Sequence, residues 1–459
     1  MNKKRKQNLK LGLALAAVAA LIFWMTTRWD VWFHNPEEQP QQLSRTPHNV
    51  MLTFGNDGEL SRNVSWQCDS VLQPSCLRLV CLADSDTTTV EATGEVFRSR
   101  NGQAAYYVAR LTALRPATSY AYQVATAGKA SPWYAFTTQE DNLQSASFLY
   151  VGDVQDTLGG QANRFLREAL QRHPRSQFLV CGGDLTERPT NQHWTETFRD
   201  LDSVAQHMPV LAVTGNHDYL KGIIMRLERR FSLVFSYFLN SMVGENQVYT
   251  CCYGPAQFFL LDSNRELPYL LTQRSWLKQQ LEQSTARWKI VVLHHPLYSI
   301  KGMNNLIQRW AFNDLIQDYG VDLVLQGHEH AYARMTHHDH NGTPTTPVYT
   351  VSHCSPKNYR IHFDDRFDKF GISSRYYQTI DIVADTLTLC AYEVYSHTLY
   401  DSLRIVKQGQ GIPALIEDRG RQIPEYMEYE PNPDSKKDRD YARRIADYRQ
   451  RHPERMAAR

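Results

Sequence analysis

Six apolar segments lie between residues 146 and 328, five of them end in a polar motif, and this pattern constrains the fold more than any other feature of the chain. Stretches with helical periodicity, at 161–173 and 272–283, lie between several of them. Such alternation predicts right-handed crossovers and a mostly parallel sheet covered by helices on both faces. We therefore expect an α/β fold with strands at 146–152, 177–183, 209–215, 258–262, 289–295 and 322–328.

The motifs at the strand exits consist largely of residue types that bind metals. A single Asp or Asn after a strand is often only a helix cap. Five such exits in one fold favour a shared site, because the carboxyl ends of parallel strands meet at one edge of a sheet. The exit residues are Asp153 and Gln155; Asp184 and Glu187; Asn216, His217 and Asp218; His294 and His295; His328 and His330.

The His-x-His pair follows the last strand, in the sequence LVLQGHEHAYAR. Side chains alternate along a strand, so the imidazoles of His328 and His330 would point the same way in extended conformation. Six or seven nitrogen and oxygen donors at one edge exceed the needs of one ion and predict two. Two cations about 3.5–4 Å apart can share a carboxylate and acidify a water molecule between them. Imidazole and carboxylate ligands favour two divalent ions of Zn, Fe, Mn or Co.

The ordered motifs GDVQ, GGDLTE, GNHD, VVLHHP and GHEHAYAR resemble those of the calcineurin-like metallophosphoesterase superfamily. The GHEHAYAR form and a preceding all-β region are most similar to the purple acid phosphatase branch. This resemblance implies a catalytic domain at 146–407, folded as a β-sandwich of two mixed sheets flanked by helices. It also implies that Asp184 bridges the metals. The remaining implied ligands are Asp153 and His330 at one site, and Asn216, His294 and His328 at the other.

The resemblance also implies catalytic roles. His217 matches the histidine that faces the substrate, and Asp218 is a candidate to orient it. His295 is either a further phosphate contact or a buried histidine satisfied by the backbone. The implied activity is hydrolysis of phosphoric monoesters of small molecules by a hydroxide held between the metals. A phosphodiesterase or pyrophosphohydrolase with the same centre, and a non-catalytic surface binding protein with a vestigial phosphoesterase domain, stay open as alternatives.

The sequence departs from the family pattern at two positions. Most of the superfamily has histidine where this chain has Gln155. Purple acid phosphatases have a tyrosine three residues after the bridging aspartate, and this chain has Glu187 there. Both residues are tentative metal ligands. Because the family's colour arises from that tyrosine bound to ferric iron, we expect this protein not to be purple.

The regions outside the catalytic domain have distinct compositions. Residues 47–139 form short alternating segments separated by turn residues, which predicts a small antiparallel sandwich. Within it, 109–124 resembles a corner of a fibronectin type III domain. Residues 31–46 are polar and predict a linker. Residues 408–459 are rich in proline and then in charge, and predict an exposed helix or a mobile extension.

Residues 1–30 predict a signal anchor or transmembrane segment. The first ten residues are basic, and 11–27 contain no charge. Aromatic residues rather than a cleavage site follow, which favours an anchor over a cleaved signal peptide. This places the catalytic body on the periplasmic or extracellular side of a membrane, or makes the protein secreted if the segment is cleaved. The apolar run is marginal in length for a bilayer.

Charge excludes one class of partner. Lys and Arg number 50 against 48 Asp and Glu, a net charge of +2, and no long basic stripe is present, so nucleic-acid binding is not expected. Arg226, Arg229 and Arg230 lie between the third and fourth strands. They predict a solvated helical face or, as the alternative, a phosphate contact. The oligomeric state is not predicted.

Overall fold

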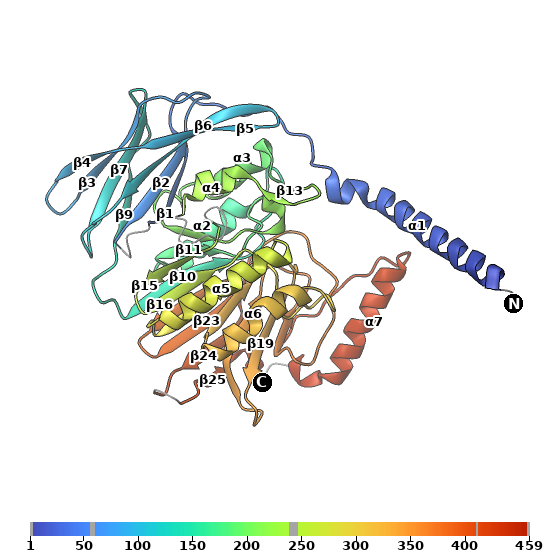
Figure 1. Ribbon diagram of the computed structural model, residues 1–459. Helices are drawn as coiled ribbons and strands as arrows, with labels where there is room; N and C mark the ends of the chain where they lie inside the picture. Colours follow the sequence, from blue (N-terminus) through green and yellow to red (C-terminus); the bar gives the residue numbers. More distant parts are fainter. Residues whose placement is uncertain (1–2, 56–59, 238–246, 410–411, 457–459) are drawn as a thin grey trace.

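The computed structural model describes residues 3–55, 60–237, 247–409 and 412–456. Two mixed sheets pack face to face in the catalytic body (Figure 1). In the first sheet three parallel strands, β10 (Ser145–Val151), β11 (Phe178–Cys181) and β12 (Val210–Ala212), lie beside antiparallel β22 (Tyr376–Val383), β23 (Thr386–Glu393), β24 (Leu399–Val406) and β25 (Leu415–Asp418).

The second sheet has a parallel centre and antiparallel edges. Its parallel strands are β16 (Ala256–Leu260), β17 (Trp288–Val292), β18 (Leu323–Gln326) and β20 (Pro344–Val351). Its antiparallel strands are β15 (Tyr249–Tyr253), β19 (Tyr332–His338) and β21 (Lys369–Gly371). The six predicted strands are therefore divided, three to each sheet, which confirms two mixed sheets and corrects the expectation of one parallel sheet.

The core between the sheets explains why these strands are apolar on both faces. Phe148 of β10 stacks on Phe178 of β11 with ring centroids 5.0 Å apart, and Phe258 of β16 meets Phe148 edge-on at 5.2 Å. Helices cover the outer faces, so each strand is buried twice. They are α2 (Ala162–Arg172) and α3 (Asn191–Asp200) on the first sheet, and α5 (Leu267–Gln283) and α6 (Leu306–Asp318) on the second.

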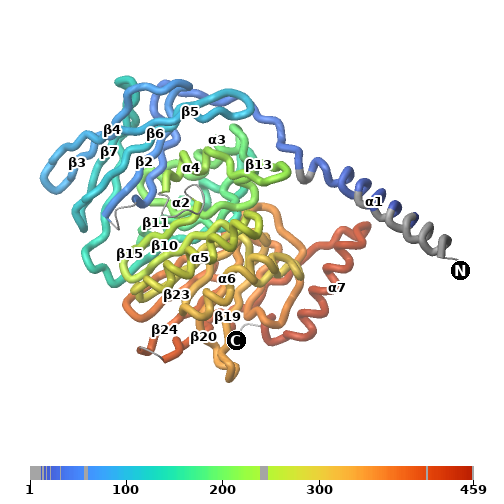
Figure 2. Tube along the Cα trace, viewed as in Figure 1, coloured from blue at the N-terminus to red at the C-terminus, as the bar shows by residue number. Residues whose placement is uncertain are grey.

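The predicted N-terminal sandwich is present and continues the first catalytic sheet. One of its sheets contains β1 (His48–Phe54), β2 (Arg62–Gln67), β5 (Thr93–Ser99) and β6 (Gly102–Leu111). The other contains β3 (Ser75–Cys81), β4 (Thr87–Glu91), β7 (Ser119–Thr126), β8 (Lys129–Ala130) and β9 (Tyr134–Thr137). Strand β1 pairs in parallel with β12, so the first sheet runs through both regions. Figure 2 follows the chain from this sandwich into the catalytic body.

The predicted linker is fixed to the body rather than free. The Glu38 carboxylate is buried and accepts the backbone N–H groups of Arg100 at 2.7 Å and Asn191 at 2.8 Å. It also pairs with the guanidinium of Arg230 at 2.9 Å. The linker therefore joins the sandwich to the catalytic body through a buried ion pair, which local polarity could not indicate.

The first helix, α1 (Lys3–Phe33), precedes this linker and projects away from the body (Figure 1). In the described part of the chain, no helix is both long and apolar enough to cross a membrane. The transmembrane segment predicted for residues 1–30 therefore lacks structural support.

The C-terminal region forms a helix, which was one of the two predicted alternatives, but this helix is packed on the body rather than fully exposed or mobile. Helix α7 (Lys436–Arg451) is highly charged, but its residues Tyr441, Ile445 and Tyr448 are buried against the second sheet's outer core. Ser435 caps the helix by accepting the N–H of Asp438. A charged sequence with three apolar positions at helical spacing is therefore a surface helix with one buried face.

The remaining short elements are η1 (Asn216–Asp218), β13 (Tyr219–Leu220), β14 (Arg226–Leu227), α4 (Arg229–Phe235), η2 (Gly420–Gln422) and η3 (Pro453–Arg455).

Candidate metal centre

The carboxyl ends of strands from both sheets meet at one edge, as the motif order predicts. The first sheet supplies Asp153, Asp184 and Asn216, and the second supplies the histidines. Ligand atoms of Asp153, Asp184 and His294 all lie within 4.8 Å of one another, and the three side chains are buried. This spacing is what a shared cation site requires.

Asp184 lies at the middle of the group. Its Oδ2 is 3.3 Å from His294 Nε2 and accepts the Gln155 amide at 3.0 Å. Its Oδ1 accepts the backbone N–H of His217 at 2.8 Å. Burial alone would raise the pKa of the carboxyl, but the neighbouring His294 and His217 hold that pKa well below its usual range. Asp184 therefore stays ionised.

Asp153 forms the second acidic position. Its Oδ2 accepts the backbone N–H of His328 at 2.6 Å, and its Oδ1 lies 3.3 Å from His330 Nε2. Within the described residues that Oδ1 has no hydrogen-bond partner, although it is fully buried. A buried carboxylate oxygen without a donor is costly unless a cation approaches it. The residues present therefore fit a metal at this position.

Asn216 and the remaining histidines complete the other side. Asn216 Oδ1 lies 2.9 Å from His328 Nδ1 and 3.2 Å from His294 Nε2. His328 therefore faces Asn216 while His330 faces Asp153. The two imidazoles do not point the same way, because β18 ends at Gln326 and the backbone of His328 turns to a φ of +70°. The extended geometry predicted for this pair is wrong.

The backbone of the site is strained where the carboxylates are presented. Positive φ angles of +44° at Asp153, +51° at Asp184 and +24° at Gln155 put non-glycine residues in the left-handed region. Such strain is typical of functional sites. Glycines allow the close approach: a Cβ on Gly215 would lie 2.0 Å from Asp184 Oδ1, and one on Gly327 would lie 2.2 Å from Asp153 Oδ2.

Backbone carbonyls orient two of the histidines. His294 Nδ1 lies 2.9 Å from the carbonyl oxygen of Gly182, and His330 Nδ1 lies 2.8 Å from that of Lys357. A carbonyl only accepts, so each Nδ1 carries a proton and each Nε2 is directed to the carboxylates. Burial lowers the pKa of His294, but Asp184 and Asp153 outweigh it and raise the value to about 10. The site therefore attracts positive charge.

The three predicted catalytic residues lie in different surroundings. His217 Nδ1 is 2.5 Å from the carbonyl oxygen of Glu187, and its Nε2 is 3.9 Å from Asp184 Oδ2. Asp218 does not orient His217: its carboxylate accepts the N–H of Gly215 at 2.7 Å and closes the turn. Burial, followed by the charge of Asp184, raises the pKa of Asp218 well above its usual range.

His295 lies beside the centre and is held by a residue that sequence reasoning missed. The Ser263 hydroxyl oxygen accepts the backbone N–H of His295 and contacts its Nδ1, both at 3.0 Å. The His295 ring packs on His328 with centroids 4.2 Å apart. Burial and the charge of His294 lower the pKa of His295 to about 3, so the ring is neutral. Ser263 follows β16, whose exit carried no recognised motif.

The two tentative ligands differ in position. Gln155 is buried against Asp184, as described above. The Glu187 carboxylate is partly exposed and lies 3.6 Å from Arg188 and 4.0 Å from His217 Nδ1. The structure thus places Glu187 against a guanidinium at the rim. Tyr359, not anticipated from the sequence, stacks on His330 with ring centroids 4.2 Å apart.

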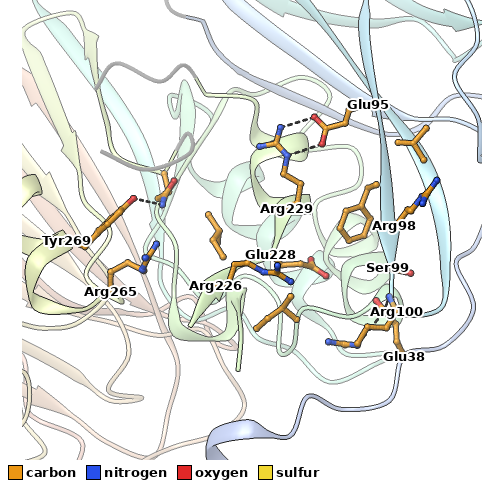
Figure 3. Close-up of a pocket in the computed structure, with 15 residues that line it drawn as sticks. Glu38, Glu95, Arg98, Ser99, Arg100, Arg226, Glu228, Arg229, Arg265 and Tyr269 are labelled. Carbon is orange, nitrogen blue, oxygen red and sulfur yellow. Dashed lines mark hydrogen bonds and ion pairs between the residues drawn. The ribbon is translucent and has the colours of Figure 1, made fainter. Parts of the chain in front are cut away.

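A large cavity of about 660 Å³ lies apart from these side chains, between the N-terminal sandwich and the β13–β14 hairpin (Figure 3). Arginines dominate its wall, but carboxylates neutralise several: Arg229 binds Glu95 at 2.8 Å, and Arg265 binds Glu266 at 2.9 Å. Arg230, behind this wall, is fully buried against Glu228 and Glu38. The predicted solvated face is therefore wrong for Arg230, which is a structural ion pair.

Comparison with known proteins agrees with this architecture. Residues 146–332 match the family described as calcineurin-like phosphoesterase, and residues 47–138 match the purple acid phosphatase N-terminal domain. The resemblance to fibronectin type III stays a prediction. Purple acid phosphatase 15 of Arabidopsis thaliana is 24% identical over 51% of this chain and 45% of its own length. Fe(3+)-Zn(2+) purple acid phosphatase 12 of the same plant is 22% identical over 63% of this chain and 65% of its own.

Among solved structures, purple acid phosphatase PPD1 from yellow lupin seeds superposes with a TM-score of 0.66 at 15% identity, over 79% of this chain and 74% of its own. That likeness supports the fold. The chain spans about half the length of the first curated relatives it matches. In this chain, the region that matches the N-terminal domain precedes the region that matches the phosphoesterase. The chain therefore joins a region that matches the purple acid phosphatase N-terminal domain to a region that matches calcineurin-like phosphoesterases, and the relatives named above are purple acid phosphatases.

Proposed function

We propose that this protein hydrolyses phosphoric monoesters with two divalent metal ions. The observation that carries the proposal is the buried group around Asp184, in which carboxylates, an amide and imidazoles from both sheets converge. The unpartnered Oδ1 of Asp153 gives this group an open acceptor for a cation. A structural ion-pair cluster would be satisfied by the chain itself.

The proposed ligands divide into two sets that share Asp184. Asp153 and His330 contact one another at one end, and Asn216 with His294 and His328 lie at the other. Nitrogen and oxygen donors suit Zn, Fe, Mn or Co, and one relative is named for Fe(3+) and Zn(2+). When bound, such ions neutralise phosphate charge and acidify the attacking water.

The chain's own residues position the ester and supply a proton. His217 is fixed by the Glu187 carbonyl at Nδ1, which directs its Nε2 toward the carboxylates. From there it can protonate the departing alcohol oxygen. Arg188, whose guanidinium lies 3.0 Å from His217 Nδ1, adds fixed positive charge near the phosphate. His295 is neutral and is held by Ser263, so it adds no positive charge near the phosphate. Its ring acts by packing against His328.

The N-terminal segment is proposed as a membrane anchor with the catalytic body outside. Basic residues precede the uncharged run at 11–27, which sets this orientation. The aromatic side chains of Phe23, Trp24 and Trp29 on α1 are at least half exposed. We propose two domains on the outer side, 47–139 and 146–407, with β25 and α7 packed on the second, which binds the phosphorylated substrate.

Metal analysis and paired assays test the hydrolase proposal. Full-length protein is purified in detergent, its metal content is measured, and hydrolysis of p-nitrophenyl phosphate is compared with that of bis(p-nitrophenyl) phosphate. We expect about two metal ions per chain, loss of activity on chelation, recovery with Zn, Fe, Mn or Co, and preference for the monoester. Activity that survives complete removal of metal overturns the proposal, and a strong preference for the diester assigns the alternative substrate class.

A further inference from the structure

Three loops around the metal centre carry large apolar side chains in solvent. Leu158, in the loop that follows Asp153, is 50% exposed. Ile223 and Ile224, at the tip of the β13–β14 hairpin after His217, are 94% and 71% exposed. Met303, in the loop after His295, is 83% exposed. Each loop leaves the same edge of the sheets that presents the candidate ligands.

Exposure of this kind is unusual because it contributes nothing to the folded core. A solitary exposed apolar residue needs no explanation, but several at one edge mark an interaction surface. We call Leu158, Ile223, Ile224 and Met303 the apolar rim.

The first helix is attached beside this rim. Asn35, just after α1, exchanges two hydrogen bonds with the backbone of Lys221: its amide donates to the Lys221 carbonyl at 3.0 Å, and its carbonyl accepts the Lys221 N–H at 2.9 Å. Lys221 lies two residues before Ile223 in the hairpin. Figure 1 shows α1 leaving the body beside the β13 hairpin. The end of α1 and the hairpin that carries Ile223 and Ile224 are therefore neighbours.

Basic residues border the apolar tips. Lys221 and Arg226 flank the hairpin tip, and Lys301 precedes Met303 by two positions. Within the described ranges, none of these three side chains forms an ion pair with a carboxylate. Lys301 Nζ lies over the Tyr359 ring, 4.3 Å from its centroid, so Lys221 and Arg226 are the cations that border the hairpin tip. Apolar side chains bordered by cations without carboxylate partners match the acyl boundary and the anionic headgroups of a bilayer. A polar, hydrated partner surface would leave the side chains of Ile223 and Ile224 without apolar contacts.

We propose that the apolar rim docks on an anionic lipid bilayer, so that the substrate class of the metal centre is a phosphomonoester carried by a lipid. The proposal rests on the hydrolase function proposed above. Water adds to phosphorus, the bond between phosphorus and the lipid oxygen breaks, and that oxygen gains a proton. The lipid alcohol then stays in the bilayer and inorganic phosphate leaves.

The hairpin is short enough for this arrangement. Ile223 is six positions after His217, so an extended chain would place their backbones at most about 20 Å apart. The turn η1 shortens that path. A headgroup at the bilayer surface is thus within reach of the site when the tip enters the interface.

Hydrogen exchange tests the docking directly. Full-length protein is incubated with vesicles of phosphatidylcholine and phosphatidylglycerol, and with detergent alone. We expect amide exchange in 219–227 and 300–305 to slow at least threefold with vesicles. If α1 is protected while both loop segments exchange at the detergent rate, the protein is anchored but the rim does not touch lipid, and the proposal is overturned. This readout does not depend on catalysis.

Kinetics test the substrate class. In the double variant Ile223→Ser with Ile224→Ser, the rate on phosphatidic acid in vesicles, divided by the rate on p-nitrophenyl phosphate, should fall about tenfold. Val383→Ser is the matched control. Val383 ends β22, is 62% exposed, and pairs with Ser145 at the start of β10, the end of that strand away from the metal centre. An equal fall in the control, or an unchanged ratio in the double variant, overturns the proposal.

Parent protein that cleaves the soluble ester but not phosphatidic acid refutes the lipid substrate alone. Parent protein that cleaves neither refutes the hydrolase function, while hydrogen exchange still decides the docking.

Discussion

Two of the clusters of buried charge in the catalytic body are built in opposite ways. In the Arg334 cluster, one guanidinium binds Asp401 at 2.7 Å, Asp418 at 2.8 Å and Asp368 at 3.2 Å. Tyr332 donates to the same Asp401 carboxylate at 2.8 Å. In the metal-ligand cluster around Asp184, carboxylates face imidazoles and one carboxylate oxygen has no donor within the described residues.

The backbone follows the same division. Arg334 lies in the regular strand β19 and binds Asp401 of β24, so its cluster ties the two sheets together. Asp153 and Asp184 lie beyond their strands with left-handed backbone. The difference indicates how to separate structural from functional charge: a structural cluster completes itself, whereas we expect the proposed metal-ligand cluster to be completed by ions from solution.

Asp184→Asn should produce the largest effect and no loss of fold. The amide keeps a hydrogen-bond acceptor for His217 N–H but loses the charge shared by both cations. We expect kcat/KM for p-nitrophenyl phosphate to fall by about 1000-fold or more, with bound metal reduced. His294 can release its proton once the charge of Asp184 is lost, so urea unfolding of the metal-free variant should show a smaller loss of stability than Arg334→Met. Full turnover with normal metal content would contradict a functional role for the cluster around Asp184.

Arg334→Met should give the reverse result. It leaves Asp401 buried without its cation, and breaking a buried pair from one side costs roughly 3–5 kcal/mol. Urea unfolding measures this loss, while kcat/KM per folded molecule should change little. The matched control is Arg421→Met, because Arg421 also binds Asp418, at 3.1 Å, but is 61% exposed. The control should cost less than about 1 kcal/mol, and an equal loss in both variants would contradict the structural role.

His217→Asn separates a proton donor from the ligands around it. The side chain contacts a carbonyl and faces Asp184 across 3.9 Å, so we expect metal content to be kept. Loss of a general acid lowers the rate by about 100-fold. The fall should be larger for an alkyl phosphate than for p-nitrophenyl phosphate, because the alkoxide is the poorer leaving group. Equal falls for the two esters would assign His217 to charge stabilisation instead.

Asp200→Asn addresses a buried carboxylate outside both clusters. Burial, then the charge of Glu196, raises the pKa of Asp200 to about 7. Because the folded pKa exceeds the unfolded value of about 3.9, the folded state binds more protons, and stability is lost as pH rises from about 4 to 7. Asparagine cannot ionise, so the variant should gain about 4 kcal/mol at pH 8 and nothing at pH 4.

Urea unfolding across this pH range measures the effect, with exposed Asp202→Asn as the control. If the parent and Asp200→Asn show the same pH dependence, Asp200 is not the group responsible. In that case, the raised pKa of a buried carboxyl would indicate neither a metal site nor a loss of stability.

The metal-ligand cluster was predictable because its residues adjoin strands that the sequence itself marks. Asp153, Asp184 and His294 each follow an apolar run, and parallel pairing gathers such exits at one edge. The Arg230 pair was not predictable, since Glu38 lies 192 positions away and no local pattern links the two. Likewise, the role of Asp218 was misjudged: adjacency in sequence suggested a contact with His217, but the turn directs its carboxylate to Gly215.

The smallest expected effect is an unchanged visible spectrum when the protein is loaded with iron. Glu187 occupies the position of the family's chromophoric tyrosine, and its carboxylate lies beside Arg188. Tyr359 is the tyrosine stacked on His330, and in the described part of the chain its hydroxyl makes no hydrogen bond to a carboxylate. In the metal-free protein, burial and then the charges of Asp153 and Asp184 raise the pKa of Tyr359 to about 12. We therefore expect no strong charge-transfer band. A band that Tyr359→Phe abolishes would show that this phenol reaches the metal and that the cluster is completed by a residue outside the predicted motifs.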